Sequence, residues 1–193
     1  MRWRPSFTPV ACLVGMAIVG CGAPSPAAQS PGHGVPVHEL EVAQIGAAKR
    51  PATTTPVGTP LYARFATGTA LGATGQALTA SLGGVTYRGA TGVWVGCEGT
   101  ASTALFGLGG EFSTLTGVLG LQPHTPAALA VRVSVIVDGD TRLTRVLRRD
   151  TPPVTVSVPV GDARSVTVAA LATEGECAPA PAPYGAIGAA SLI

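Results

Sequence analysis

Hydrophobic and polar residues alternate most regularly between positions 129 and 137. Residues 131–137 read Val-Arg-Val-Ser-Val-Ile-Val, so valine occupies every second position. This period of two is typical of a β-strand with one buried face. The Asp-Gly pair at positions 138–139 predicts a hairpin turn into a second strand over residues 141–147, because this pair after an alternating strand is the strongest local hairpin signal.

A second alternation, over residues 154–160, predicts another half-buried strand. Pro159 belongs near an edge or at the end of that strand, because proline has no N–H to donate. Other short β-like runs are divided by glycine-rich turns and lie at residues 61–65, 77–82, 85–87, 93–95, 104–108, 115–121, 142–147 and 165–171. Regular short strands of this kind predict an all-β sandwich or barrel.

The first twenty residues have a different pattern. Arg2 and Arg4 precede an apolar run over residues 10–19. The run has the length of a signal-peptide core and is too short for an ordinary membrane span. We therefore expect residues 1–20 to be a lipoprotein signal peptide and the mature chain to be exported.

The end of this segment, residues 18–21, reads Ile-Val-Gly-Cys and resembles the bacterial lipobox. The resemblance implies cleavage before Cys21 and lipidation of that residue with chains such as palmitate. Two or three acyl chains form a stable anchor where one would not, so we expect a lipoprotein on the extracytoplasmic face of the cell membrane. The alternative is a plain secretory signal cut near Ala23 or Ala28.

Residues 21–59 are rich in proline, alanine, serine, threonine and glycine. Such a composition cannot bury a core, so it predicts a disordered tether. A partly extended proline-rich segment spans about 3 Å per residue, which gives a reach of roughly 100 Å. The folded domain is expected over residues 60–193.

Two of the four cysteines remain once the signal peptide and the lipid site are accounted for. Cys12 leaves with the signal peptide and Cys21 takes the lipid, so Cys97 and Cys177 remain in a compartment that permits disulfides. We predict that these two are bonded, since closing a loop of about 80 residues would stabilise the fold by about 4 kcal/mol. Two unrelated buried thiols are the alternative.

Several motifs of the expected domain resemble those of one family. Residues 84–87 read Gly-Val-Thr-Tyr, and the stretch 104–121 reads Ala-Leu-Phe-Gly-Leu-Gly-Gly-Glu-Phe-Ser-Thr-Leu-Thr-Gly-Val-Leu-Gly-Leu. A strand with an Asp-Gly turn at 131–140 and a strand pair at 154–168 follow these motifs, in the order in which the family has them. Together they resemble the NPCBM/NEW2 family of carbohydrate-binding modules. The resemblance implies a jelly-roll β-sandwich of the galactose-binding-like kind and recognition of sugars.

The last motif of the domain, at residues 187–192, departs from the pattern of that family. Where the family has tryptophan and aspartate, this chain has Ile187 and Ala189. A stacking surface and a carboxylate that could orient a ligand are therefore missing at these positions. The departure favours a second hypothesis, a protein-interaction or sensor module that keeps the fold and no longer binds sugar.

Two aromatic residues are the candidates for ligand binding. Trp94 lies between glycines shortly before Cys97, where it could stack on a sugar or pack against the bridge, as tryptophans in sandwiches often do. Tyr184 follows the proline-rich stretch 178–183 and is expected to be exposed beside the bridge. Exposure of both on one concave surface would favour sugar binding.

The acidic residues do not form a recognisable catalytic or calcium-binding pattern in the sequence. Asp138 and Asp140 flank a turn glycine and are expected to stabilise the turn, since no calcium-loop pattern surrounds them. Glu98, Glu174 and Glu176 could form an acidic patch around the bridge, but their spacing does not identify a glycosidase pair. Four arginines within residues 142–149 are explained most simply by an ion-paired sheet face, with contact to anionic lipid or wall phosphate as the alternative.

Charge and motifs narrow the function further. The net charge of +2 comes from Arg2 and Arg4, so nothing predicts binding to nucleic acid. His33, His38 and His124 have no metal-site spacing, and no nucleophile, zinc or phosphate-binding motif occurs. We expect a non-enzymatic lipoprotein, with no cofactor or metal, whose domain binds a glycan or cell-envelope polysaccharide. The alanine-, glycine-, arginine- and valine-rich composition suggests an actinobacterial source.

Overall fold

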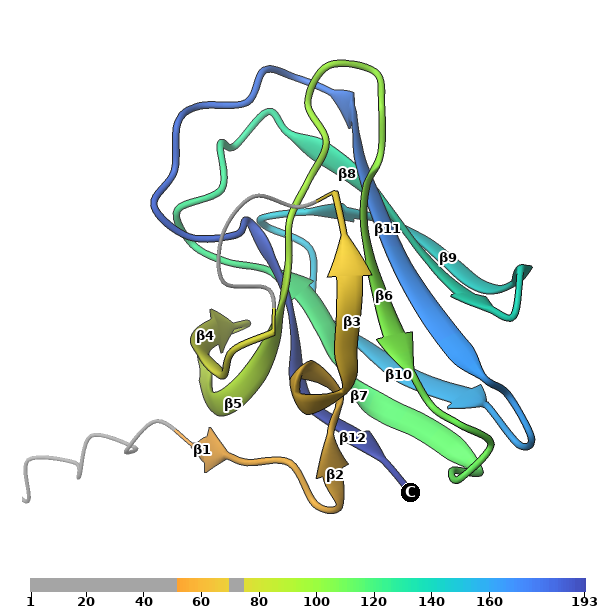
Figure 1. The fold of residues 1–193 in the computed structure, drawn as a ribbon. Helices are drawn as coiled ribbons and strands as arrows, with labels where there is room; N and C mark the ends of the chain where they lie inside the picture. Colours follow the sequence, from red (N-terminus) through yellow and green to blue (C-terminus); the bar gives the residue numbers. More distant parts are fainter. Residues whose placement is uncertain (1–51, 70–74) are drawn as a thin grey trace, which may run out of the picture. The chain divides into compact units, whose positions relative to one another are not determined.

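The computed structural model describes residues 52–69 and 75–193. The expected signal peptide over residues 1–20, the lipid site at Cys21 and most of the expected tether lie outside the described residues. The described chain forms twelve strands and one short 3-10 helix, η1 (Figure 1), with the bounds β1 Thr53–Thr54, β2 Thr59–Pro60, η1 Leu61–Arg64, β3 Phe65–Gly68, β4 Leu78–Leu82, β5 Val85–Val93, β6 Ser102–Gly107, β7 Thr114–Leu121, β8 Ala130–Val137, β9 Asp140–Arg148, β10 Val154–Pro159, β11 Ser165–Glu174 and β12 Gly185–Leu192. No described helix is long and apolar enough to cross a membrane.

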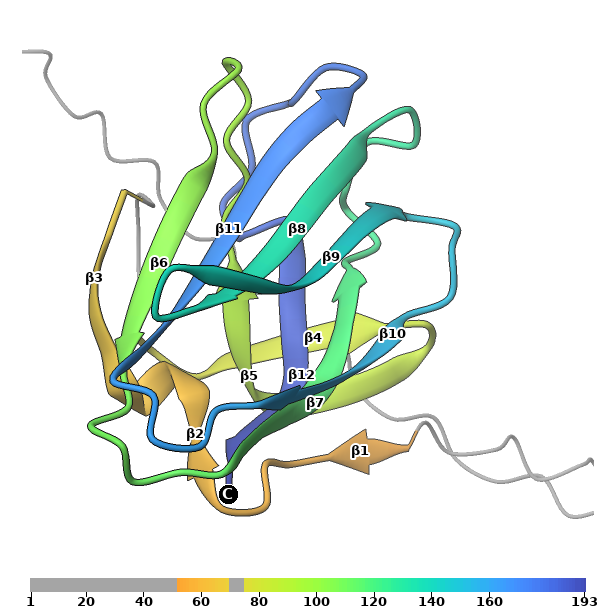
Figure 2. The same cartoon turned by 90° about the vertical axis from the view of Figure 1, so that its right-hand side faces the viewer.

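The strands form two facing sheets. One sheet has the order β3-β6-β11-β8-β9, and the other has the path β1-β5-β12-β7-β10, with β2 paired to β12 and β4 paired to β5. Figure 2 shows the first sheet in front of the second. The expected all-β jelly-roll sandwich is confirmed.

The core lies between the two sheets, and the alternating strands supply much of it. The four valines of residues 131–137 are at most 5% exposed, while Arg132 between them is exposed. On β10, Val156 and Val158 are buried and Thr155 is exposed. Full burial of one such side chain stabilises the fold by about 1.5–3 kcal/mol. Pro159 is the last residue of β10, which forms an edge of its sheet, as predicted.

The predicted hairpin is present. Val137 pairs with Asp140, which leaves Asp138 and Gly139 as the two turn residues, with φ angles of 46° and 93°. The Asp138 carboxylate reaches across to the next connection: its Oδ2 accepts the N–H of Arg164 at 3.0 Å, and its Oδ1 accepts the N–H of Ser165 at 2.8 Å. Asp138 therefore ties the β8–β9 turn to the start of β11, the neighbouring strand in the sheet; the hydrogen bonds of its carboxylate go to this connection, whereas the sequence predicted hydrogen bonds within its own turn.

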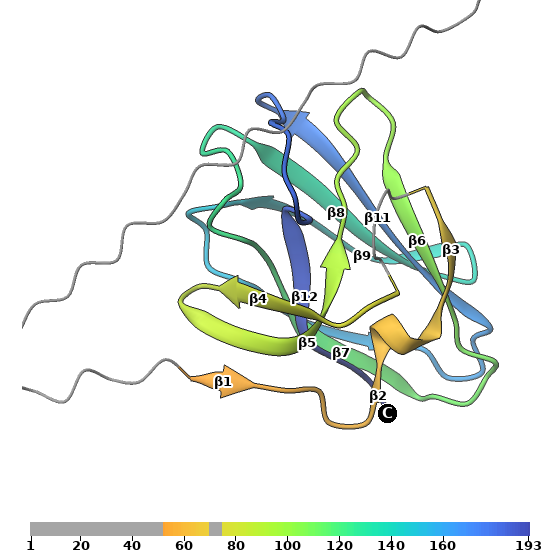
Figure 3. The ribbon, with the colours of Figure 1, turned by 60° about the vertical axis from the view of Figure 1, so that its left-hand side comes forward.

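Strand β12 is the one long strand that the alternation does not predict. It lies between β5 and β7, and seven of its eight residues are buried. Its inner face joins the main core, while its outer face lies under the β4–β5 hairpin, where Ala80, Leu82 and Tyr87 form a second small core with Ala186 (Figure 3). Because both faces are covered, β12 has no period of two.

Two other segments differ from the sequence prediction. Residues 61–65 were expected as a strand, but Leu61–Arg64 forms a 3-10 helix and only Phe65 begins a strand. Strands β1 and β2 bring residues 53–54 and 59–60 into the second sheet, so pairing begins before the expected boundary at residue 60. The side chains of β1 are exposed, so its pairing with β5 uses the backbone and leaves no hydrophobic pattern.

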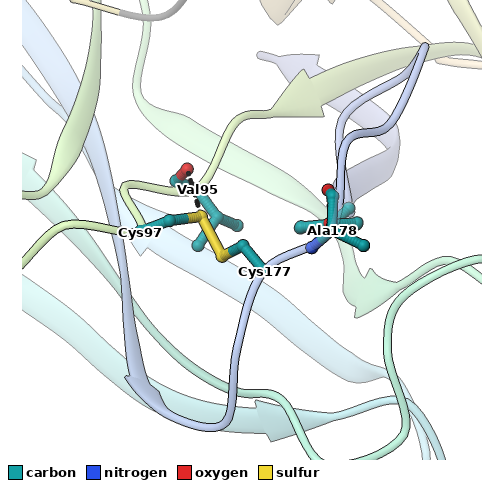
Figure 4. Close-up of a disulfide and its surroundings, with 5 residues drawn as sticks. Val95, Cys97, Cys177 and Ala178 are labelled. Atoms are coloured by element: carbon teal, nitrogen blue, oxygen red, sulfur yellow. Dashed lines mark hydrogen bonds between the residues drawn. A yellow bond between two sulfur atoms is a disulfide. The ribbon is translucent and has the colours of Figure 1, made fainter.

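Cys97 and Cys177 form the predicted disulfide, with a Cα–Cα distance of 6.0 Å. Figure 4 shows the bridge joining the loop after β5 to the segment that leads to Ala178. Val95 and Cys177 both pack against the main core. The bridge thus ties two loops at the same end of the sandwich.

Loss of this bridge should lower stability substantially. The bridge closes a loop with a sequence separation of 80, so the Cys97→Ser/Cys177→Ser double variant is expected to lose about 4 kcal/mol of unfolding free energy. Urea unfolding of the oxidised protein and the double variant measures the difference. A dithiothreitol-treated wild-type sample should match the double variant; equal stability of all three samples would contradict the prediction.

Asp138 should make part of the stability depend on pH. The backbone N–H of Arg164, followed by the contacts of Ser165, lowers the pKa of Asp138 below its usual value of 3.8. A lowered folded-state pKa gives stability that is complete above the unfolded value and is lost as the pH falls through the folded value. The Asp138→Asn variant keeps a residue that tolerates a positive φ but removes the charge.

The difference in unfolding free energy between wild type and Asp138→Asn is therefore expected to be largest near neutral pH and to shrink below about pH 4. Urea titrations from neutral to acid pH measure it. A difference that stays constant over this range would show that the charge of Asp138 does not contribute.

Candidate functional site

Two loops meet at the disulfide end of the sandwich. The first follows β5 and contains Trp94 and Cys97; the second runs from Cys177 to Tyr184 and leads into β12. Gly185, the first residue of β12, pairs with Val93, the last residue of β5. This register places Trp94 directly beside the end of the second loop.

Two hollows lie on either side of Trp94. The first has a volume of about 500 Å³ and is lined by Thr69, Trp94, Val95, Gly96, Cys97, Glu98, Thr100, Ala101 and Ser102. The second has a volume of about 300 Å³ and is lined by Gln76, Ala77, Leu78, Gly92, Trp94, Pro181, Ala182 and Pro183. Trp94 is half-buried and is the residue that the two hollows share.

The backbone around Gly96 fixes the wall of the first hollow. Gly96 donates its N–H to Ala170 at 3.0 Å and accepts the N–H of Ala172 at 2.9 Å, which attaches the loop to β11. A Cβ at Gly96 would lie 1.8 Å from the carbonyl oxygen of Thr100, so only glycine fits there. The loop therefore folds back tightly on itself between Gly96 and Thr100, with Glu98 exposed at its tip.

Tyr184 does not lie exposed, and this expectation is wrong. The residue is 6% exposed and belongs to the main core. Its hydroxyl donates to the carbonyl of Ala178 and accepts the N–H of Ala178 at 2.8 Å. Because the loop is rich in proline it has few internal hydrogen bonds of its own, so the Tyr184 hydroxyl satisfies backbone groups that would otherwise be unpaired. Tyr184 supports the loop and offers no face to a ligand.

Residues of the β7–β8 connection hold the same loop from the other side. The buried Gln122 side chain donates through Nε2 to the carbonyl of Pro183 at 2.7 Å. The Thr125 hydroxyl donates to the carbonyl of Tyr184 at 3.2 Å. Pro183, a lining residue of the second hollow, is thereby fixed in place. Sequence patterns did not identify Gln122 and Thr125 as functional residues. Their burial as polar side chains becomes visible only in the structure.

The acidic residues around the disulfide differ in their ion pairing. Glu98 and Glu176 flank the two bonded cysteines, and both are exposed. Glu174 forms an ion pair with Arg148. The expected acidic patch therefore reduces to Glu98, which lines the first hollow, and Glu176, with the charge of Glu174 balanced by Arg148.

The arginines after β8 follow the ion-pair prediction in part. Arg142 pairs with Asp140 at 3.4 Å, and Arg148 pairs with Glu174 rather than with the neighbouring Asp150. Within residues 52–69 and 75–193, no group of three or more histidine, cysteine or acidic side chains could hold a metal ion.

The departures in the closing strand lie away from the hollows. Ile187 is fully buried in the main core, and Ala189 has a φ of 48° at an irregularity in β12. In this chain, position 187 therefore fills space between the sheets and does not form part of the surface at the loop end. The absence of tryptophan at this position carries no information about the hollows beside Trp94.

Comparison with solved structures shows the same fold. The chain is similar to CBM51-2 with the INT domain of Clostridium perfringens ZmpB, at a TM-score of 0.50 and 14% identity, over 66% of this chain and 30% of that chain. It is also similar to the ZmpB M60 catalytic domain with CBM51-1 and CBM51-2, at 0.47 and 20% identity, over 72% of this chain and 14% of that one. The CBM51 of a Clostridium perfringens GH95 in complex with methyl-galactose gives 0.46 and 15% identity, over 72% and 91%.

The chain thus spans less than a third of the two ZmpB chains. Comparison with curated protein sequences gives no significant match. The sequence profile of the NPCBM/NEW2 domain matches residues 53–178, from β1 to the segment just after the disulfide. The chain belongs to the NPCBM/NEW2 domain family.

Proposed function

We propose that the domain is a non-catalytic module that binds a glycan at the two hollows beside Trp94. The observation that carries the proposal is the position of Trp94, a half-buried aromatic shared by two open hollows. The C–H faces of a sugar are apolar and its hydroxyls need directed partners. Trp94 offers the first kind of contact, while Thr69, Thr100 and Ser102 offer the second.

The rigidity of the loops supports this proposal. The disulfide, the Gln122 contact and the Tyr184 hydroxyl hold both loops before any ligand arrives. A site that is ordered in advance loses less conformational entropy on binding than a flexible one. Small ligands such as sugars bury little surface, so this saving matters for their affinity. Membership of the NPCBM/NEW2 family supports the same assignment.

We further propose that lipid at Cys21 holds the module on the outer face of the cell membrane, with the proline-rich segment between the lipid and the domain. The support is the Ile-Val-Gly-Cys sequence after a basic, then apolar, segment. A domain held in this way would meet polysaccharides of the cell envelope or of the surroundings.

A protein-interaction module is the second candidate. Tyr87, Phe106 and Tyr184 are buried, so Trp94 is the only aromatic among the described residues that line the hollows. Sugar sites often use more than one aromatic face, whereas a protein partner can be anchored by a single tryptophan.

The Trp94→Ala variant tests the glycan proposal. The full chain, purified in a detergent without a sugar headgroup, is incubated with a glycan array, insoluble polysaccharides and cell-wall preparations. We expect binding that weakens about ten-fold or more in Trp94→Ala, equivalent to roughly 1.4 kcal/mol, because the apolar face of the site is removed.

Phe112→Ala is the matched control, since Phe112 is a half-buried aromatic that packs under Arg64 and lines neither hollow. Its binding should equal that of the wild type once circular dichroism shows that both variants are folded. Failure of the wild type to bind any glycan or wall preparation would refute the proposal and favour the protein-interaction alternative.

The lipid proposal has a separate test. In a bacterial host that processes lipoproteins, the Cys21→Ala variant should incorporate no labelled fatty acid and should move from the membrane fraction to the soluble fraction, because the acylation site is lost. Cys12→Ala is the control, since Cys12 lies in the expected signal peptide, and it should remain in the membrane fraction. Equal labelling of Cys21→Ala and wild type would refute the lipid site.

A further inference from the structure

The two hollows carry almost no charge. Of the described residues that line them, Glu98 is the only charged one. The remaining lining side chains are hydroxyl, amide or apolar groups, together with glycines and the disulfide sulfur of Cys97. The electrostatic character of the site therefore depends on one carboxylate.

Glu98 is held in place by its neighbours in the chain. Cys97 before it is bonded to Cys177, and Gly99 after it has a φ of 78° within the tight turn between Gly96 and Thr100. The turn itself is attached to β11 through the hydrogen bonds of Gly96. The backbone of Glu98 is therefore anchored at the first hollow, which the residue lines.

No ion pair in the described part of the chain balances the charge of Glu98. The pairs found there join Arg64 to Glu111, Arg142 to Asp140, and Arg148 to Glu174. Glu98 is exposed and lines the open hollow, so its carboxylate can reach a ligand bound there. A carboxylate attracts cations and repels anions, and its oxygens also accept hydrogen bonds from neutral hydroxyls.

Building on the proposed glycan site, we propose that Glu98 makes the first hollow selective for sugars that carry a free amino group. A 2-amino-2-deoxyhexose, as found in glycans with missing N-acetyl groups, would place its ammonium near the carboxylate. The parent neutral sugar binds less tightly, and a uronic acid is disfavoured by repulsion between like charges. Trp94 supplies the apolar contact, and the charge of Glu98 makes the affinity differ among sugars of similar shape.

The size of the preference follows from the exposure of the site. Pairs between solvent-exposed charges contribute little, so each step in the series from amine to parent sugar to uronic acid should change the affinity by about three-fold. Salt screens such charges, so the steps should shrink when the ionic strength rises. Binding of the neutral parent sugar should not depend on salt.

The test uses the full chain in a detergent without a sugar headgroup, at about pH 6, where the sugar amine is protonated and the carboxyl group of the uronic acid is ionised. Affinities are measured by NMR titration for two matched series: glucose, glucosamine and glucuronic acid, and galactose, galactosamine and galacturonic acid. We expect the order amine, parent, uronic acid in the wild type, and equal affinities within a series for Glu98→Gln.

Glu176→Gln is the matched control, because Glu176 adjoins the other bonded cysteine and lines neither hollow. It should keep the wild-type order. Binding of the parent sugar without this order, or an equal effect of both variants, overturns the role of Glu98 and leaves the glycan site standing. Absence of binding by every sugar of both series overturns the role of Glu98, and absence of binding by polysaccharides as well overturns both proposals.

Discussion

The pairing of Gly185 with Val93 determines the geometry of the candidate site. Strand β5 ends at Val93 and β12 begins at Gly185, so the residues just beyond this pair are forced to be neighbours. Trp94 leaves the sheet on one side and the proline-rich loop arrives on the other. The disulfide then joins the two loops a few residues further out. The hollows therefore result from two features: the strand register that makes the two loops neighbours, and the disulfide that joins them.

This register depends on small residues in β12. The strand is covered on both faces, and a Cβ at Gly188 would lie 2.4 Å from the ring of Tyr87. Tyr87 belongs to the β4–β5 hairpin, so the hairpin can lie on the outer face only if β12 is narrow there. Larger side chains would push the hairpin away and move the β5 end that carries Trp94. The glycine- and alanine-rich sequence of β12 is thus a packing requirement.

Strands with one buried face could be predicted from the sequence. Residues 131–137 and 154–160 alternate because water lies on one side and the core on the other, and the Asp-Gly pair predicts the turn locally. The disulfide could be predicted because Cys97 and Cys177 are the two cysteines that the expected signal peptide and lipid site leave over. Strand β12 could not be predicted because burial on both faces removes the alternation. The exposure of Tyr184 was misjudged because its partner groups at Ala178 become close only in the folded loop. The hollows depend on the same long-range contacts.

Because the chain has few charged residues, each charge near the candidate site has a large effect on its electrostatic character. With 11% charged residues, a site lined by hydroxyls and apolar groups is what composition alone would produce. The ion pair of Arg148 with Glu174 removes one acidic residue from the disulfide end, and the attachment of the Gly96 turn to β11 keeps Glu98 at the first hollow. The two loops therefore set the shape of the hollows, and Glu98 is the one charged residue among the described residues that line them.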